Sequence, residues 1–217
     1  MSYYQPQPTK NRTALWVGLA VLLLVLAVGA YLLGRNHGGA TPSGGPAAST
    51  APVISWSIVG SNPVPGSSIH GPRNTVNGRA TGFTHDSLGA ALAAVNISFR
   101  LDSEVGPQVY EATVREQCFG DVDTTLEQIR NSTTAAAQGS TTPSEDWYKI
   151  TSGDPAGDLV LISIAVKTPQ SLASGGYAKF DRTMRWVDND WRMQVPPLRP
   201  LIIPSVSGYT LLGRPNV

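Results

Sequence analysis

Histidine, cysteine and serine are the side chains of this chain that could support catalysis or bind a metal. His85, Asp86 and Ser87 are the residue types of a nucleophilic triad, but consecutive residues point in different directions and cannot form the relay geometry. We predict instead that this cluster caps the start of a helix. His37 and His70 have no partner at the spacing of metal ligands. The sequence therefore predicts no catalytic residue, no cofactor-binding residue and no metal ligand, and it favours a protein that is not an enzyme.

Cys118 is the only cysteine, so the chain cannot form an internal disulfide. We interpret it as a small buried apolar side chain, and the alternative is a reactive or intermolecular thiol. Phosphate loops, dinucleotide fingerprints and nucleophile elbows do not occur in the sequence. No cofactor is therefore predicted.

The apolar segment 14–33 is the element that would position all the others. Its 20 residues contain no charge, and as a helix they would span the roughly 30 Å hydrocarbon core of a bilayer. Trp16 and Tyr31 lie where interfacial aromatic residues belong. We predict a single transmembrane helix here. The alternative is a cleaved signal peptide with its cleavage site at 28–30.

The charges around this segment predict its orientation. Lys10 and Arg12 precede it and only Arg35 follows closely, which places the tail 1–13 in the cytoplasm and the C-terminal domain outside. All 15 acidic residues follow the segment, and from Arg73 onward they exceed the 13 Lys and Arg residues by two. Such a mixed surface lacks the basic footprint of a nucleic-acid binder, so no direct contact with nucleic acid is expected.

Composition divides the remainder of the chain into four parts. Residues 34–52 are a linker of Gly, Pro, Ser and Ala. Residues 53–82 are expected to form an extended arm, in which 53–59 could also be a short strand. Residues 83–196 form the extracytoplasmic α+β domain. Residues 197–217 are a Pro-rich extended tail, whose apolar side chains cover either the edge of the domain or a partner.

Apolar residues at helical spacing predict three helices in the first part of this domain, over 86–99, 107–119 and 121–138. The first helix has a flank of small residues that would allow another element to pack closely. Asp121 is expected to cap the third helix.

After Pro143 the apolar period changes to two, which predicts an antiparallel sheet. The predicted strands cover residues 147–151, 159–167, 177–187 and 190–195. A two-residue turn at 188–189 would pair Trp186 with Trp191. The tryptophan pair is interpreted as core packing, with a ligand or partner platform as the alternative.

Helices followed by a curled antiparallel meander, behind one anchor and a tether, resemble the periplasmic assembly subunits of type IV secretion systems. This resemblance implies the nuclear-transport-factor-2-like fold. Motifs at 71–73, 82–85 and 89–97 are similar to those of uncharacterised actinobacterial bitopic membrane proteins of conjugative elements. Residues 185–187 and 190–192 agree with the closing hairpin of that group.

The resemblance implies a non-enzymatic scaffold or assembly subunit of a conjugative DNA-transfer or type IV secretion-like apparatus. Its expected partners are the membrane and other subunits of the machine. A small-residue pair, Ala14 and Gly18, leaves a homo-oligomer possible. The alternatives are a small-molecule or lipid-binding domain and an accessory subunit of a cell-envelope lipid-import complex. The inward faces of the last strands, predicted to carry Val, Ile, Met and Trp without a carboxylate, favour apolar ligand binding over catalysis.

Overall fold

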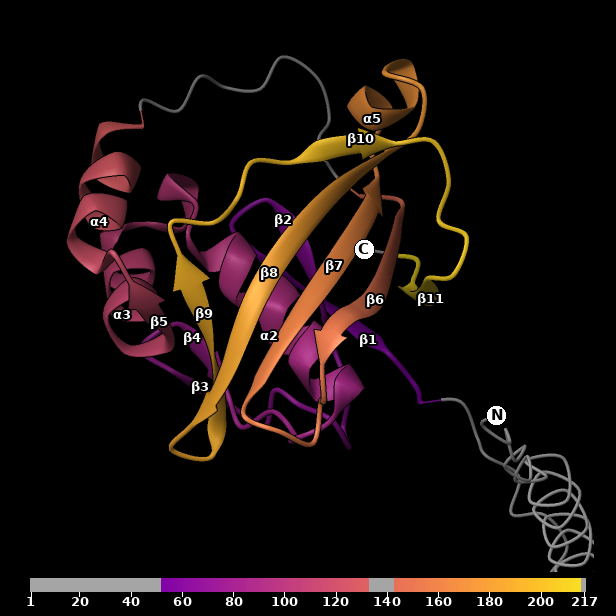
Figure 1. Cartoon of the computed structure of the whole chain (residues 1–217). Coiled ribbons are helices and arrows are strands. Elements are labelled where there is room, and N and C mark those ends of the chain that lie inside the picture. The colour runs from indigo at the N-terminus through magenta and orange to yellow at the C-terminus, as the bar shows by residue number, and fades with distance from the viewer. Residues whose placement is uncertain (1–51, 133–142, 216–217) are drawn as a thin grey trace, which may run out of the picture. The chain divides into compact units, whose positions relative to one another are not determined.

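The computed structural model describes residues 52–132 and 143–215 (Figure 1). The predicted membrane helix and nearly all of the predicted linker lie outside these residues. Within them, no helix is both long enough and apolar enough to cross a membrane. In chain order, the elements are β1 (Ser55–Val59), β2 (Asn62–Gly66), β3 (Asn74–Val76), β4 (Arg79–Thr81), α2 (Ser87–Arg100), a 3-10 turn (Ser103–Val105), α3 (Pro107–Gln117), β5 (Cys118–Gly120), α4 (Val122–Asn131), β6 (Glu145–Gly153), β7 (Leu159–Lys167), α5 (Pro169–Ala173), β8 (Tyr177–Val187), β9 (Asp190–Val195), β10 (Leu201–Ile203) and β11 (Thr210–Gly213).

The main sheet contains seven strands in the order β11-β6-β7-β8-β9-β5, and β10 pairs with the start of β8. It is a mixed sheet, because β5 runs parallel to β9 while the other pairs are antiparallel. The predicted nuclear-transport-factor-2-like fold, with about three helices followed by a curled antiparallel meander, is therefore wrong. The described chain is mostly β structure, four strands precede α2, and β5 separates α3 from α4. These early strands are short and, in β2, contain two prolines, so the sequence shows no alternating pattern there.

Helix α2 packs on one side against the sheet and on the other against β2 (Figure 1). Asp86 caps its start by accepting a hydrogen bond from the Gly89 amide at 2.8 Å. Four alanines of this helix, at positions 90, 91, 93 and 94, are completely buried. The small-residue flank thus allows close packing on both sides, and the helix has no exposed face over most of its length.

Helices α3 and α4 form a second, smaller cluster beside the sheet. Its buried members are Tyr110, Val114, Leu126 and Ile129. The predicted helix start at Pro107 and the predicted cap at Asp121 are confirmed. Helix α4 ends at Asn131, and the predicted continuation from 133 to 138 lies outside the described residues.

The β8–β9 hairpin has the predicted register, with Trp186 opposite Trp191. Asp188 and Asn189 form its turn with φ angles of 54° and 62°, a backbone conformation that Asp and Asn tolerate better than most residues. Trp191 is completely buried and Trp186 packs against the same core. Core packing of the tryptophan pair is confirmed.

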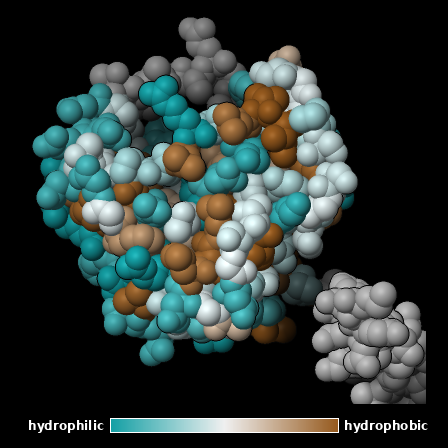
Figure 2. All heavy atoms as spheres, in the orientation of Figure 1, coloured by the Kyte–Doolittle hydropathy of each residue, from teal (hydrophilic) through white to brown (hydrophobic). Residues whose placement is uncertain are grey.

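The segments before and after the central elements add short strands. Residues 53–82, the expected extended arm, contain the hairpins β1–β2 and β3–β4. In the tail, β10 pairs with β8 and β11 pairs with β6, so the tail covers the domain's own sheet. Leu201 and Ile202 of β10 remain well exposed. Figure 2 shows apolar side chains gathered at the end of the molecule where Figure 1 places β10 and α5.

Candidate functional site

The structure separates the three side chains of the predicted helix start. Asp86 is the helix cap, as expected. The ring of His85 instead stacks on Trp186, with centroids 4.2 Å apart, and its Nε2 lies 2.9 Å from the Gly157 carbonyl oxygen. His85 and Asp86 therefore serve in packing and capping.

A second histidine joins this helix start from a distant turn. His70 Nδ1 lies 3.0 Å from an Asp86 carboxylate oxygen and 3.2 Å from the Thr84 hydroxyl. Burial raises the pKa of Asp86, but hydrogen bonds from Gly89, Thr84 and His70 outweigh it, and the net pKa is lowered. The sequence carries no signal for this contact, because sixteen residues separate the partners. The pair ties the loop before β3 to α2.

Cys118 is buried at the start of β5, and burial raises the pKa of its thiol to about 12. A thiol with this pKa stays protonated and unreactive at neutral pH. The interpretation as a small buried side chain is thus supported. Among residues 52–132 and 143–215, no group of three His, Cys, Asp or Glu side chains could hold a metal ion.

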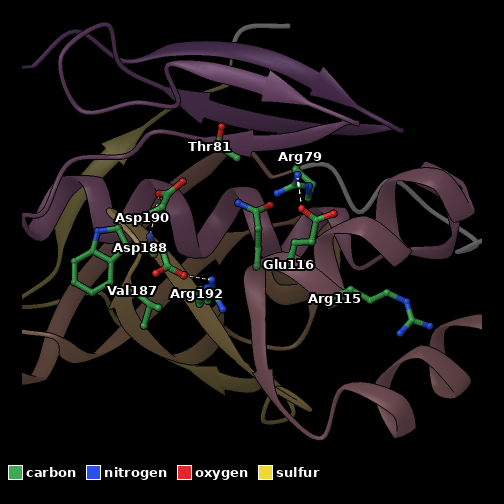
Figure 3. A pocket seen from close by; sticks show the side chains of 10 residues that line it. Arg79, Thr81, Arg115, Glu116, Val187, Asp188, Asp190 and Arg192 are labelled. Atoms are coloured by element: carbon green, nitrogen blue, oxygen red, sulfur yellow. Dashed lines mark hydrogen bonds and ion pairs between the residues drawn. The ribbon is translucent and has the colours of Figure 1, made fainter.

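A polar groove of about 390 Å³ lies where β4, the end of α3 and the β8–β9 turn meet (Figure 3). Its lining residues are Arg79, Thr81, Arg115, Glu116, Gln117, Val187, Asp188, Asp190, Trp191 and Arg192. Three arginines and three acids thus come together from three parts of the chain. Only the hairpin part belongs to the motifs noted in the sequence, so the groove could not be assembled from spacing alone.

The charges of the groove are largely paired with one another. Arg79 forms an ion pair with Glu116 at 2.6 Å, and Arg192 forms one with Asp188 at 2.5 Å. The acidic partners are open to solvent, because the side chains of Glu116 and Asp188 are 53% and 75% exposed. Arg115 extends away from the other side chains in Figure 3 and has no ion pair within the described part of the chain.

Asp190 has a different role from the other two acids. Its carboxylate accepts hydrogen bonds from the amides of Gly82 at 2.8 Å, Phe83 at 3.3 Å and Trp191 at 2.9 Å. Burial raises the pKa of Asp190, and these amides reverse only part of the increase. The Trp191 indole donates in turn to the Thr84 carbonyl at 2.9 Å. Asp190 and Trp191 therefore clamp the 82–85 motif to the closing hairpin.

Two buried polar atoms of residues that line the groove have no hydrogen-bond partner within the described part of the chain. They are Nε of Arg79 and Oε1 of Gln117. The amide nitrogen of Gln117 donates to the Ala80 carbonyl at 2.7 Å, which fixes the side chain against β4. The groove contains positive and negative groups side by side and no nucleophile held against a base, so the geometry is suited to recognising a surface of mixed charge.

Comparison with known proteins gives one match. A family model described as "Domain of unknown function (DUF8175)" matches residues 34–211. No curated protein and no solved structure matches the chain. The matched range includes every residue of the polar groove and of the Asp190 clamp.

Proposed function

We propose, for a chain that belongs to the DUF8175 family, a role as a non-enzymatic, membrane-anchored scaffold or assembly subunit of a conjugative DNA-transfer or type IV secretion-like apparatus. The predicted helix 14–33 anchors the chain in the cell membrane. The described domain then lies outside the cytoplasm and binds another subunit through the polar groove.

The observation that carries this proposal is the pairing of opposite charges in the groove, through carboxylates that are open to solvent. Ion pairs between exposed side chains contribute only about 0–1 kcal/mol to stability. Asp188 can therefore exchange the partly exposed Arg192 for a group on another protein at little cost. Glu116 keeps its partner, because the Arg79 side chain is only 11% exposed and would be left as a buried unpaired cation. Arg115 adds a cation that is not committed to any carboxylate among the described residues. A nucleic acid would favour a groove with positive charge alone.

The choice of machine is supported by the motifs at 71–73 and 82–85 and by the closing hairpin. The structure gives Gly82, Phe83 and the hairpin a shared task, since the Asp190 carboxylate accepts hydrogen bonds from the amides of Gly82 and Phe83. The resemblance thus covers residues that the fold needs. It supports a common domain in this chain and in the membrane proteins of conjugative elements.

Site-specific crosslinking in cells tests the proposal with the full-length chain. A photoreactive amino acid replaces Arg115 in the groove, and the matched control replaces the exposed Glu127 on the outer side of α4. Adducts from position 115 with subunits of a transfer or secretion apparatus, absent from position 127, are the expected result.

Two results would overturn the proposal. One is adducts from position 115 with subunits of a lipid-import complex, which would favour that alternative. The other is unchanged DNA transfer and secretion in cells that lack the protein.

A further inference from the structure

A small apolar pocket, the Arg182 pocket, lies between α2 and the sheet and has a volume of about 130 Å³. Its apolar walls are Val95 and Phe99 of α2, Ile164 and Val166 of β7, and Phe180 of β8. An engineered apolar cavity of about 150 Å³ holds benzene. The Arg182 pocket is slightly smaller but is partly open to solvent, so an apolar group of about the size of benzene can enter it.

One charged side chain lines the pocket. Arg182 is only 7% exposed, and it lies on the face of β8 that is directed toward the core, two residues before the buried Met184. Its Nε donates to the Ser98 hydroxyl at 2.8 Å, and its Nη1 donates to the Asp181 carbonyl at 3.0 Å. The Asp181 carboxylate itself pairs with Lys179 at 2.9 Å.

Arg182 therefore has neutral hydrogen-bond partners and no carboxylate ion-pair partner within the described residues. A guanidinium has five N–H donors, and two of them are used in these two hydrogen bonds. Burial lowers the pKa of Arg182 to about 10, so the side chain remains charged at neutral pH. A buried cation without an anion is costly, and an anion bound beside it would remove much of that cost.

We infer that the Arg182 pocket binds a small monocarboxylate whose apolar body has about the size of a benzene ring. The carboxylate would accept two parallel hydrogen bonds from the free N–H groups of Arg182, the bidentate geometry that guanidinium favours. The ring or branched chain would contact Val95, Ile164 and Val166. The small volume excludes a long acyl chain, and the apolar walls disfavour inorganic phosphate.

Equilibrium dialysis of radiolabelled benzoate against the full-length protein in detergent tests the inference, with protein-free detergent as the blank. We expect saturable binding of benzoate by the wild type. Unlabelled benzoate should compete at least tenfold better than benzamide, which has the same shape and no charge.

Variants on the same strand provide matched controls. Arg182→Gln removes the buried cation and should weaken benzoate binding at least tenfold. Arg185→Gln removes an exposed arginine of β8 and should leave the affinity unchanged. Ile164→Phe fills the pocket while it keeps Arg182, and it should also abolish binding. This variant keeps the test valid if Arg182→Gln fails to fold.

Three results would overturn the inference. They are an absence of benzoate binding above the blank, equal competition by benzoate and benzamide, and unchanged binding in both Arg182→Gln and Ile164→Phe. Competition by phosphate as strong as that by benzoate would also contradict it, because it would indicate a general anion site.

Discussion

The polar groove and the Arg182 pocket use arginine in opposite ways. In the groove, Arg79 and Arg192 each face a carboxylate that is more than half exposed to water. In the pocket, Arg182 is buried and is held by a hydroxyl and a carbonyl group. The groove thus has ion pairs whose carboxylates are in contact with water, which screens them. The Arg182 guanidinium is instead desolvated, lies over the Phe180 ring and has no ion-pair partner within the described residues.

This difference indicates what each region can do. Screened and paired charges contribute little to folding, so they can be rearranged for recognition. A desolvated cation is unfavourable by itself, so its environment favours any anion that fits. The comparison is therefore consistent with the proposed roles, protein recognition by the groove and binding of a small anion by the pocket. It rests on the free-energy cost of an unpaired charge in the protein interior.

The strongest way to break the comparison is to place a new charge in the interior. Ala91 lies in α2 and is completely buried. Ala91→Glu should destabilise the domain by several kcal/mol, because the carboxylate would be buried without a partner. Thermal unfolding checks this expectation, with Gln128→Glu on the exposed face of α4 as a control that should change stability by less than about 0.5 kcal/mol. An unchanged melting temperature for Ala91→Glu would contradict the central position of α2.

Asp146 is a buried acid, as Arg182 is a buried base. Its titration makes the cost of burying a charge measurable as a pH dependence of stability. Its carboxyl group on β6 is completely buried, neither oxygen has a hydrogen-bond partner within the described residues, and burial raises its pKa to about 7. The folded state then retains a proton that the unfolded state releases near pH 4. The free energy of unfolding is therefore not reduced by Asp146 below about pH 4. It decreases as the pH rises from about 4 to about 7, and above that pH the contribution of Asp146 stays constant.

Asp146→Asn should remove this dependence. The variant should gain stability relative to the wild type as the pH rises from 4 to 7, reaching a few kcal/mol at pH 8, since one pKa unit corresponds to about 1.4 kcal/mol. Urea unfolding at a series of pH values measures the difference, and the exposed Glu127→Gln is the control. A difference that does not vary with pH would show that Asp146 is already compensated in the folded protein.

The sequence predicts the elements whose signals are local. Asp86 and the apolar spacing after it define α2, and the alternation on both sides of Asp188-Asn189 defines the hairpin register. Of the strands before α2, only β1 is among the sequence-based expectations, as a short strand or extended arm at 53–59. The other three escape prediction because they are three to five residues long and depend on pairing for their existence. Strand β5 is equally short, and its parallel pairing with β9 makes the sheet mixed. This non-local pairing is the main reason that the fold class was mispredicted.

The two sites differ in how far the sequence could reveal them. The groove needs Arg79, Glu116 and Asp188 to meet from three segments, and no spacing encodes that meeting. The pocket had a usable signal, because the period of two that places Met184 and Trp186 inward also places Arg182 inward. The prediction of an apolar inward face does not include this buried arginine.

Replacing Arg182 tests the same comparison through a smaller expected change in the free energy of unfolding. Arg182→Met keeps the apolar stem and removes the desolvated charge, so we expect a gain of about 1 kcal/mol in the free energy of unfolding. The partially exposed Arg192→Met should change the same quantity by less than about 0.5 kcal/mol. Urea unfolding of both variants measures the contrast. A loss of more than about 2 kcal/mol in Arg182→Met would show that the hydrogen bonds to Ser98 and Asp181 outweigh the desolvation of the guanidinium.

The smallest effect on stability is expected when an ion pair of the groove is removed and the backbone conformation is kept. Asp188 has a positive φ, which Asn also tolerates, so Asp188→Asn breaks the ion pair with Arg192 and preserves the turn. The free energy of unfolding should fall by about 0.5 kcal/mol or less, and the difference should shrink in 0.5 M salt. Crosslinking from position 115 should nevertheless weaken, because recognition depends on the charges that stability does not need. A loss above about 2 kcal/mol would make the groove a structural element like the Asp190 clamp, and the contrast with the Arg182 pocket would no longer hold.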